Sequence, residues 1–334
     1  MRKVGVSSII FDNVYLKSWG TASGPKEKDG PLGEYIDIDF KDLYCGESTW
    51  EEAEMNLMRN AFSEALRKSQ LKVEDLSLAT GGDLNNQIAI SNYLMNDYHI
   101  PFIGIYGACS TAVLSIINGA SFVDSGFGKY VACMTSSHNS TSERQFRYPT
   151  EYGGQKPPSV TMTVTGSGVG ILTSEKTGIR ISKATIGCVT SSDELDAQDM
   201  GRTMAPAAAM TLKQHLEDFN LTPSDYDLIV TGDLSLYGSK VFVDILKEYL
   251  IDVKDVYKDC GLMIYDIENQ QVSAGGSGCG CASLVMYGYL CTELYKNKYK
   301  KILVIATGAL LNPVMVAQGK KIPSIAHAIV LERC

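Results

Sequence analysis

The stretch Phe102 to Leu114, FIGIYGACSTAVL, decides the fold. An apolar run that predicts a buried strand meets a Gly-Ala-Cys-Ser-Thr turn and then an apolar run typical of a helix. Cys109 is therefore expected at a strand-to-helix elbow, with its sulfur beside a helix N-terminus. Free backbone N–H groups and the positive end of the helix dipole favour a thiolate or a bound anion at such a position.

The composition is that of an ordinary globular protein. Of the 334 residues, 45% are hydrophobic and 20% are charged, which excludes a disordered chain and allows two packed halves or two domains. The net charge of -8 argues against wholesale binding to nucleic acid or to an anionic lipid surface. We therefore expect no nucleic-acid partner, and any anionic ligand must be held locally.

The nine cysteines predict a reducing compartment, because they contain no Cys-x-x-Cys pair and no secretory leader precedes them. Cys279-Gly280-Cys281 has the wrong spacing for structural zinc, so we expect no metal site and no cofactor. No apolar run reaches the roughly 20 residues that span a bilayer. The sequence thus predicts a cytoplasmic protein that associates with a membrane only through partners.

Apolar periodicity predicts helices and strands that alternate along the chain. Helices are expected at 50–69 with Ser48 or Thr49 as cap, at 87–98, at 111–114 and beyond, at 209–219, at 239–250 with Ser239 as cap, and from the 273–283 elbow to about Tyr295. Strands are expected at 2–6, 76–80, 102–106, 130–135, 161–174, 227–231, 301–307 and 326–331. Residues 20–48 and 139–160 are expected to be insert loops.

The same order of elements occurs twice in the sequence. Aligning Asp83 with Asp233, each in a Gly-Asp turn after a strand, gives an offset of 150 (233 − 83). Aligning Thr135 with Thr307, each at the end of a later strand, gives an offset of 172 (307 − 135). A helix, a strand with a Gly-Asp turn, an elbow helix and a further strand recur in this order, which indicates a duplication.

The duplication predicts an α/β fold of two similar halves, residues 1–175 and 176–334, with duplicated sheets and helices on their faces. The second offset sets Cys109 opposite Cys281. Pseudo-twofold packing of the halves would bring the two elbow helices together at the centre of the molecule.

At this point the chain resembles the thiolase superfamily, whose members include the ketoacyl synthases. The elbow Gly107-Ala108-Cys109-Ser110 matches the one that carries the acylated nucleophile in that family. The resemblance covers nearly the whole chain. It implies a five-layer αβαβα sandwich of pseudo-twofold halves, with the Cys109 helix at its centre, and it implies a homodimer.

Longer and more idiosyncratic motifs resemble the stage V sporulation protein AD family of endospore-forming bacteria. These motifs are PKEKDGPL at 25–32, SERQFRYPTEYGGQ at 142–155, KPP at 156–158, TGSG at 165–168 and MAPAAA at 204–209. The resemblance implies a protein that binds dipicolinic acid (pyridine-2,6-dicarboxylate), free or as its calcium chelate, and supports its uptake into the developing spore. It also implies other stage V sporulation membrane proteins as partners, and a peripheral location on the cytoplasmic face of the spore inner membrane.

Condensation chemistry needs donors that stabilise enolate and oxyanion charge. Ketoacyl synthases of the third type place a His in a Pro-His-Gln-Ala-Asn segment and an Asn in a Gly-Asn-Thr segment. The matching segments here are IVTGDLS at 229–235 and SAGGS at 273–277, which contain neither residue. An acidic Asp233 near Cys109 would raise the pKa of the thiol and oppose the helix dipole.

We therefore interpret Cys109 as a vestigial nucleophile and expect no enzyme activity. Cys109 also fits a purely structural role as a small buried apolar residue, and such a residue can still form part of a pocket wall. Two other functions stay open. One is an acyl-CoA-dependent condensing enzyme or acyltransferase that uses Cys109, and the other is a purely architectural subunit.

The histidines are divided between structural and binding roles. His138 follows a strand within a polar cluster, where a pocket position and an exposed loop position are equally compatible with the sequence. His327, on an apolar strand, is expected to be a satisfied core histidine rather than a base. His99 and His215 are expected to be structural or at the surface.

A site for a flat dicarboxylate needs N–H or hydroxyl donors, a cation and an apolar slot. The predicted ligand-binding residues are Cys109, Ser136, Ser137, His138, Asn139, Arg144, Arg147, Thr165, Gly166, Asp233, Gly275 and Gly276. Arg144 and Arg147 are the candidate cations, although a solvated loop face or a subunit contact explains them equally well. Asp39, Asp83 and Asp233 could bind calcium in a chelate, but turn capping is the favoured role for Gly-Asp turns.

Overall fold

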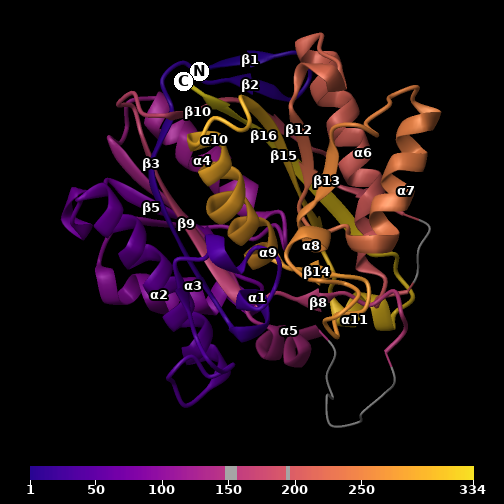
Figure 1. The fold of residues 1–334 in the computed structure, drawn as a ribbon, viewed down its shortest axis with the longest axis horizontal. Helices are drawn as coiled ribbons and strands as arrows, with labels where there is room; N and C mark the ends of the chain where they lie inside the picture. Colours follow the sequence, from indigo (N-terminus) through magenta and orange to yellow (C-terminus); the bar gives the residue numbers. More distant parts are fainter. Residues whose placement is uncertain (147–155, 193–195) are drawn as a thin grey trace.

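Two sets of five strands form the centre of the fold in the computed structural model, which describes residues 1–146, 156–192 and 196–334 (Figure 1). The first set contains β3 (Tyr15–Ser23), β5 (Leu78–Gly82), β6 (Phe102–Gly104), β7 (Tyr130–Ser137) and β9 (Gly166–Thr173). The second set contains β10 (Ile179–Ile186), β12 (Leu228–Thr231), β13 (Tyr257–Asp259), β15 (Lys301–Ala309) and β16 (Pro323–Arg333). Their order across the sheet is β13-β12-β15-β16-β10-β3-β9-β7-β5-β6.

The two sets repeat one topology. In the first set β5 pairs in parallel with β6 and β7, whereas β9 is antiparallel to β7 and β3. In the second set β12 pairs in parallel with β13 and β15, whereas β16 is antiparallel to β15 and β10. The sets meet where Tyr15 of β3 pairs with Arg180 of β10. The predicted repeat of the fold is confirmed, while the division at 175/176 stays a prediction.

Short strands complete the sheets. They are β1 (Arg2–Val4), β2 (Ser8–Ile10), β4 (Ile38–Asp39) and β11 (Thr190–Ser191) along the large sheet, and β8 (Met162–Thr163) and β14 (Gly276–Ser277), which pair with each other in parallel. The strand β14 lies in the second elbow (residues 273–283), directly before α9, and β8 precedes β9. Their pairing therefore joins the second elbow to the first set of strands.

Helices lie in three layers around the strands. They are α1 (Pro25–Lys28), α2 (Trp50–Ser69), α3 (Ala89–Tyr98), α4 (Thr111–Asp124), α5 (Asn139–Phe146), α6 (Met200–Phe219), α7 (Ser235–Glu248), α8 (Cys260–Met263), α9 (Cys279–Leu284), α10 (Cys291–Tyr295) and α11 (Pro313–Ala317). Figure 1 shows α4 and α9, which contact each other, between the two sets of strands. The helices α2 and α3 cover the outer face of the first set, and α6 with α7 covers the second. This arrangement confirms the αβαβα sandwich.

The helix α2 forms as the sequence predicts. Thr49 is its N-cap, with Oγ1 accepting from the backbone N–H of Glu52 at 3.3 Å, and the helix ends at Gln70 in a left-handed conformation. Leu57, Met58 and Phe62 are fully buried on the face that packs against β3 and β9. Burial of three such side chains stabilises the fold by several kcal/mol, at roughly 1.5–3 kcal/mol each.

Two helices begin earlier than predicted. The helix α6 begins at Met200 instead of residue 209, because Asp199 caps it by accepting from the N–H of Arg202 at 3.1 Å. The helix α7 begins at Ser235, so Ser239 lies inside the helix and is not its cap. The elbow helix does end at Tyr295, but it is interrupted by the π-helical turn η6 (Val285–Leu290).

The predicted insert loops also contain regular structure. The strand β3 continues to Ser23, and α1 and β4 follow it within the 20–48 segment, while the 139–160 segment begins with α5. The expected strand at 161–174 is two strands, β8 and β9. Sequence alternation is absent in β9 because all eight of its residues are buried.

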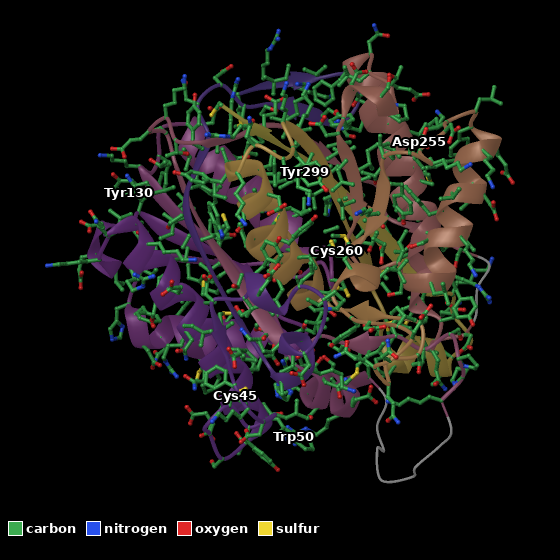
Figure 2. All side chains as sticks on the ribbon, viewed as in Figure 1. Cys45, Trp50, Tyr130, Asp255, Cys260 and Tyr299 are labelled. Carbon is green, nitrogen blue, oxygen red and sulfur yellow. The ribbon has the colours of Figure 1, made fainter. Side chains whose placement is uncertain are left out.

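No helix of the described residues is long and apolar enough to cross a membrane. All nine cysteines are free thiols, of which only Cys188 and Cys334 are exposed. Figure 2 shows Cys260 in the interior and Tyr130 toward the edge of the molecule. Within the described ranges, no group of three or more His, Cys, Asp or Glu residues is placed to hold a metal ion.

Candidate functional site

The Cys109 elbow has the predicted geometry. The strand β6 ends at Gly104 and α4 begins at Thr111, with Cys109 almost buried between them. Ala108 has φ of 50°, a left-handed conformation that is uncommon for alanine. The hydroxyl of Thr111 accepts from the N–H of Gly107 at 2.9 Å and donates to the carbonyl of Ala108 at 2.7 Å, so the motif itself holds the turn.

Asp233 lies beside Cys109 and is fully buried. Its Oδ2 accepts from the backbone N–H of Gly278 at 2.9 Å, and its Oδ1 accepts from the hydroxyl of Thr307 at 2.6 Å. The carboxylate is also close enough to the Cys109 thiol for its charge to act on that group. Burial and the charge of Asp233 raise the pKa of the Cys109 thiol well above its ordinary value, so the sulfur is a protonated thiol at neutral pH.

Burial also raises the pKa of Asp233, to about 6. Hydrogen bonds from Thr307 and Gly278 lower it again, but they do not cancel the cost of desolvation. The proximity of Asp233 to Cys109, which the sequence predicted, is confirmed. The role of Asp233 is to link the two elbows, since Gly278 stands immediately before α9.

The thiols of the second elbow are engaged with backbone carbonyls. Cys279 donates to the carbonyl of Ser136 at 2.9 Å, and Cys281 donates to the carbonyl of Gly232 at 3.5 Å. Both are fully buried, and burial raises the pKa of each well above the ordinary value for cysteine. Neither thiol lines the Cys109 cavity described below.

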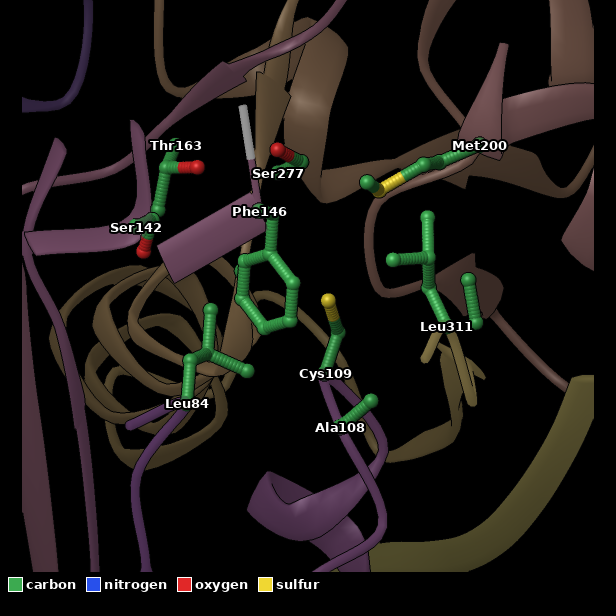
Figure 3. A pocket seen from close by; sticks show the side chains of 11 residues that line it. Leu84, Ala108, Cys109, Ser142, Phe146, Thr163, Met200, Ser277 and Leu311 are labelled. Carbon is green, nitrogen blue, oxygen red and sulfur yellow. The ribbon is translucent and has the colours of Figure 1, made fainter. Parts of the chain in front are cut away.

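A small cavity opens at Cys109, with a volume of about 30 Å³. It is lined by Leu84, Ala108, Cys109, Ser142, Phe146, Thr163, Met200, Ser277, Gly278, Ala309 and Leu311. Figure 3 shows the Cys109 sulfur pointing into the space between Phe146, Met200 and Leu311. The lining is mainly apolar and includes no cation. This space holds about two water molecules, because one water needs roughly 10–15 Å³ of such volume.

Ser136 and Ser137 face away from this cavity. The hydroxyl of Ser136 donates to Glu54 Oε1 at 3.0 Å, and that of Ser137 donates to the carbonyl of Val164 at 2.7 Å. Ser137 also accepts from the N–H of Gly280 at 3.1 Å. These two hydroxyls therefore connect β7 to its neighbours.

His138 is fully buried and does not line the Cys109 cavity. Its Nδ1 accepts from the N–H of Ser140 at 3.1 Å, so its Nε2 carries the proton and donates to the carbonyl of Leu43 at 2.7 Å. Burial lowers the pKa of His138 below its ordinary value. The ring is thus a neutral group that fastens the 41–45 segment to α5, and neither sequence alternative describes it.

Arg144 lies at the surface, with 47% of its side chain exposed. It forms an ion pair with Glu51 and stacks over the ring of Trp50 at 5.4 Å from the ring centroid. It does not reach the Cys109 cavity, which agrees with the alternative of a solvated face. Arg147, the other predicted cation, lies outside the described residues.

The remaining predicted residues do not line the Cys109 cavity. Thr165 Oγ1 accepts from the N–H of Asn139 at 3.1 Å, and the N–H of Thr165 donates to Glu27 at 2.9 Å. Gly166 begins β9, where a Cβ would collide with Leu284. The carbonyl of Gly275 accepts from the N–H of Met162 at 2.8 Å.

The carbonyl of Gly276 accepts from the hydroxyl of Ser235 at 2.7 Å. Of the predicted residues that the structure describes, Cys109 alone lines this cavity, and Asp233 is buried behind it. Asn139 lines a second cavity on the other side of α5.

The acidic residues proposed for calcium are not gathered in one place. Asp83 accepts from the N–H groups of Asn85 at 2.9 Å and Ser91 at 2.8 Å, which confirms its role as a turn cap. Asp39 is exposed and pairs with Lys28 at 3.2 Å. His327 and His215 are buried as expected of structural residues, and burial lowers the pKa of His327 to about 4.

Glu54 is a buried carboxyl group that the sequence analysis did not single out. It accepts hydrogen bonds from Ser136, from Thr141 at 2.7 Å and from Asn85 at 3.0 Å. Burial, followed by the charge of Asp83, raises the pKa of Glu54 to about 8. The buried residues Leu57, Met58 and Ala61 follow Glu54 by three, four and seven positions. This helical spacing could have placed Glu54 on the buried face of α2.

The five layers and the position of the cysteine elbow define a thiolase-like fold. Solved structures of this fold include the 3-oxoacyl-[acyl-carrier-protein] synthase III of Aquifex aeolicus VF5, with a TM-score of 0.60 and 15% identity over 96% of this chain and 99% of that chain. An OleA variant of Xanthomonas campestris bound with cerulenin has a TM-score of 0.62 and 11% identity over 97% of this chain and 98% of that chain. At these identities the likeness shows the fold alone.

The chain belongs to the family described as stage V sporulation protein AD, whose sequence profile matches residues 5–332. It is 48% identical over 334 residues to the stage V sporulation protein AD of Bacillus subtilis (strain 168), and the match covers 100% of this chain and 98% of that relative.

Proposed function

We propose that this protein is a non-catalytic, thiolase-like protein that binds dipicolinic acid, free or as its calcium chelate, and supports its uptake into the developing spore. Membership of the sporulation family supports the setting. The observation that carries the non-catalytic part is the fully buried carboxylate of Asp233 beside Cys109, whose charge raises the pKa of the thiol.

Asp233 opposes acyl transfer in two ways. A thiolate at Cys109 would lie next to a carboxylate in a buried setting, where like charges repel strongly. In addition, the Gly278 N–H at the start of the second elbow, a group able to stabilise an oxyanion, already donates to Asp233. These contacts of Asp233 therefore stabilise the structure of the elbow and disfavour a nucleophilic thiolate at Cys109.

An acyl-CoA-dependent condensing enzyme or acyltransferase is the second candidate. The intact elbow favours it, because Cys109 still lines a cavity at the start of the α4 helix. Incubation with acyl-CoA followed by mass spectrometry separates the two functions. We expect no adduct on Cys109, and an acyl adduct that disappears in Cys109→Ala would overturn the non-catalytic proposal.

Calorimetric titration with dipicolinate, alone and with equimolar calcium, tests the binding function itself. Saturable binding is expected, and its absence for both forms would leave an architectural role. We further propose a homodimer that associates with stage V sporulation membrane proteins on the cytoplasmic face of the spore inner membrane. Light scattering of the purified chain measures the first of these, with twice the monomer mass as the expected result.

A further inference from the structure

The helix α11 is apolar in sequence but is not buried. Its five residues, Pro313–Ala317, are all apolar, yet none of them is buried. Val314 is 64% exposed and Met315 is 47% exposed, while Val316 is half-buried against the core of the second set of strands. A helix without a polar face is normally buried, and an exposed apolar patch marks a surface that contacts something else.

The α11 segment is held firmly at both of its ends. Leu311 and Ile322, which flank it, are buried, and the N–H of Leu310 donates to the carbonyl of Pro323 at 2.8 Å. Asn312 caps the helix by accepting from the N–H groups of its second and third residues, at 3.0 and 3.1 Å. The apolar side chains are therefore presented by an ordered loop and not by a frayed end.

Positive charge accompanies this apolar surface. Residues 309–323 contain Lys320 and Lys321 and no aspartate or glutamate, in a chain whose net charge is -8. Both lysines are exposed. Apolar side chains next to lysines fit an anionic bilayer, because the apolar groups enter below the headgroups while the ammonium groups approach the lipid phosphates. The negative charge of the whole chain opposes broad adsorption and confines such contact to a local segment.

A second copy of the chain fits the same surface less well. A twofold contact through α11 would bring the lysines of one copy toward those of the other, where like charges repel. Figure 1 shows α11 near the lower edge of the molecule, outside the central strands. The segment is thus a small projecting surface, which a flat partner can reach.

We propose that residues 312–321 form a lipid-contact loop, in which Val314 and Met315 enter the apolar part of an anionic bilayer and Lys320 approaches the headgroup phosphates. The proposed function assigns membrane contact to partner proteins, and this inference adds direct contact with lipid. It does not depend on dipicolinate binding. The bilayer is contacted and not spanned, in agreement with the length of α11.

The test is flotation of the full chain with vesicles in the absence of dipicolinate. The vesicles contain phosphatidylglycerol and phosphatidylcholine in equal parts, or phosphatidylcholine alone. The unmodified chain is expected to bind the anionic vesicles about fivefold or more tightly than the neutral ones. The double variant Val314→Ser/Met315→Ser should bind anionic vesicles about tenfold or more weakly, because it removes the inserted apolar surface. Lys320→Gln should bind anionic vesicles about fivefold more weakly and neutral vesicles equally.

Leu250→Ser is the matched control, since Leu250 is 93% exposed and lies outside the loop. The strands β12, β13 and β15 are mutually parallel, so Leu250, which precedes β13, lies toward the edge where these strands begin. The α11 segment instead follows the end of β15. Vesicle binding by Leu250→Ser is expected to equal that of the unmodified chain, and thermal melting confirms that each variant is folded.

Three results would overturn the inference. They are absence of vesicle binding by the unmodified chain, unchanged binding in Val314→Ser/Met315→Ser, and equal weakening in that variant and in Leu250→Ser. The first result would assign the α11 surface to a protein partner. Failure of the chain to bind dipicolinate would contradict the proposed function and leave the vesicle result unaffected, so the two failures are distinguishable.

Discussion

The buried carboxylate of Asp233 lies beside the thiol of Cys109 and raises its pKa, although the two residues are separated by more than a third of the chain. Cys109 comes from the elbow after β6, and Asp233 comes from the turn after β12. Thr307 and Gly278 hold the same carboxylate from two other directions. The turn after β12 therefore places a negative charge of the protein beside the thiol of the elbow.

Asp233→Asn should make Cys109 more reactive. The change removes the nearest negative charge, so the pKa of the thiol falls and the thiolate fraction at pH 8 rises. We expect alkylation of Cys109 by iodoacetamide to be at least about tenfold faster than in the unmodified chain, which corresponds to about one pKa unit. Peptide mass spectrometry over time measures the rate at this one cysteine.

The exposed cysteines Cys188 and Cys334 are internal references in that experiment, because their alkylation should be the same in both proteins. A rate at Cys109 that stays unchanged while the references react normally would mean that burial alone suppresses the thiol. A rate that rises at all three would indicate unfolding instead of a local electrostatic effect.

The sequence predicts this site in outline because its main features are local. The Gly-Ala-Cys-Ser-Thr motif contains the hydroxyl groups that hold its own turn, as Thr111 shows. Asp233 follows a strand that lies next to β15 in the sheet, so its position beside the central elbow follows from topology once the repeat is recognised. The fold and the proximity of Cys109 to Asp233 can therefore be predicted from the sequence alone.

The residues that form the walls of the cavity could not be predicted from the sequence in the same way. The helix α5 begins with Asn139 and three hydroxyl residues, which are poor helix formers, and it is held by tertiary contacts such as Thr141 to Glu54. His138 is directed by a carbonyl from the distant residue Leu43. Partners that lie far apart in sequence leave no periodic signal, and this is why the predicted donor set includes side chains that face elsewhere.

Gly308→Ala should destabilise the Cys109 elbow through a steric clash with its backbone. A Cβ at Gly308, in β15, would lie 2.2 Å from the carbonyl oxygen of Gly107, which is backbone and cannot move aside without shifting the turn. Overpacking of this kind costs about 1–3 kcal/mol or more. We expect urea denaturation to show that loss, and an unchanged midpoint would mean that the elbow yields freely.

Glu54→Gln should change how stability depends on pH. Folding raises the pKa of Glu54 from 4.5 to about 8, so the folded chain holds this proton more tightly than the unfolded chain. Its contribution to stability is therefore complete below pH 4.5 and is lost as the pH rises through 8. The melting temperature of the unmodified chain should fall relative to that of Glu54→Gln between pH 5 and pH 8.5.

The comparison isolates Glu54, because Asp233 and Asp259, whose pKa values burial raises to about 6, are present in both proteins. Parallel melting curves across the whole pH range would contradict a buried, proton-binding Glu54. Circular dichroism melts in matched buffers of constant ionic strength provide the measurement.

Tyr265→Phe should destabilise the fold, whereas Tyr287→Phe should not. Both rings are buried, but the hydroxyl of Tyr265 donates to the buried carboxyl of Glu27, while that of Tyr287 has no hydrogen-bond partner among the described residues. Without Tyr265 the Oε1 of Glu27 retains only the N–H of Thr165, at 2.9 Å. Leaving a buried acceptor short of a donor costs about 1–3 kcal/mol, whereas removing an unpaired hydroxyl is neutral or favourable. In urea denaturation, the free energies of unfolding of the two variants should differ by at least about 1 kcal/mol. Equal losses would show that ring packing, and not the contact with Glu27, holds α1 against the α8 segment.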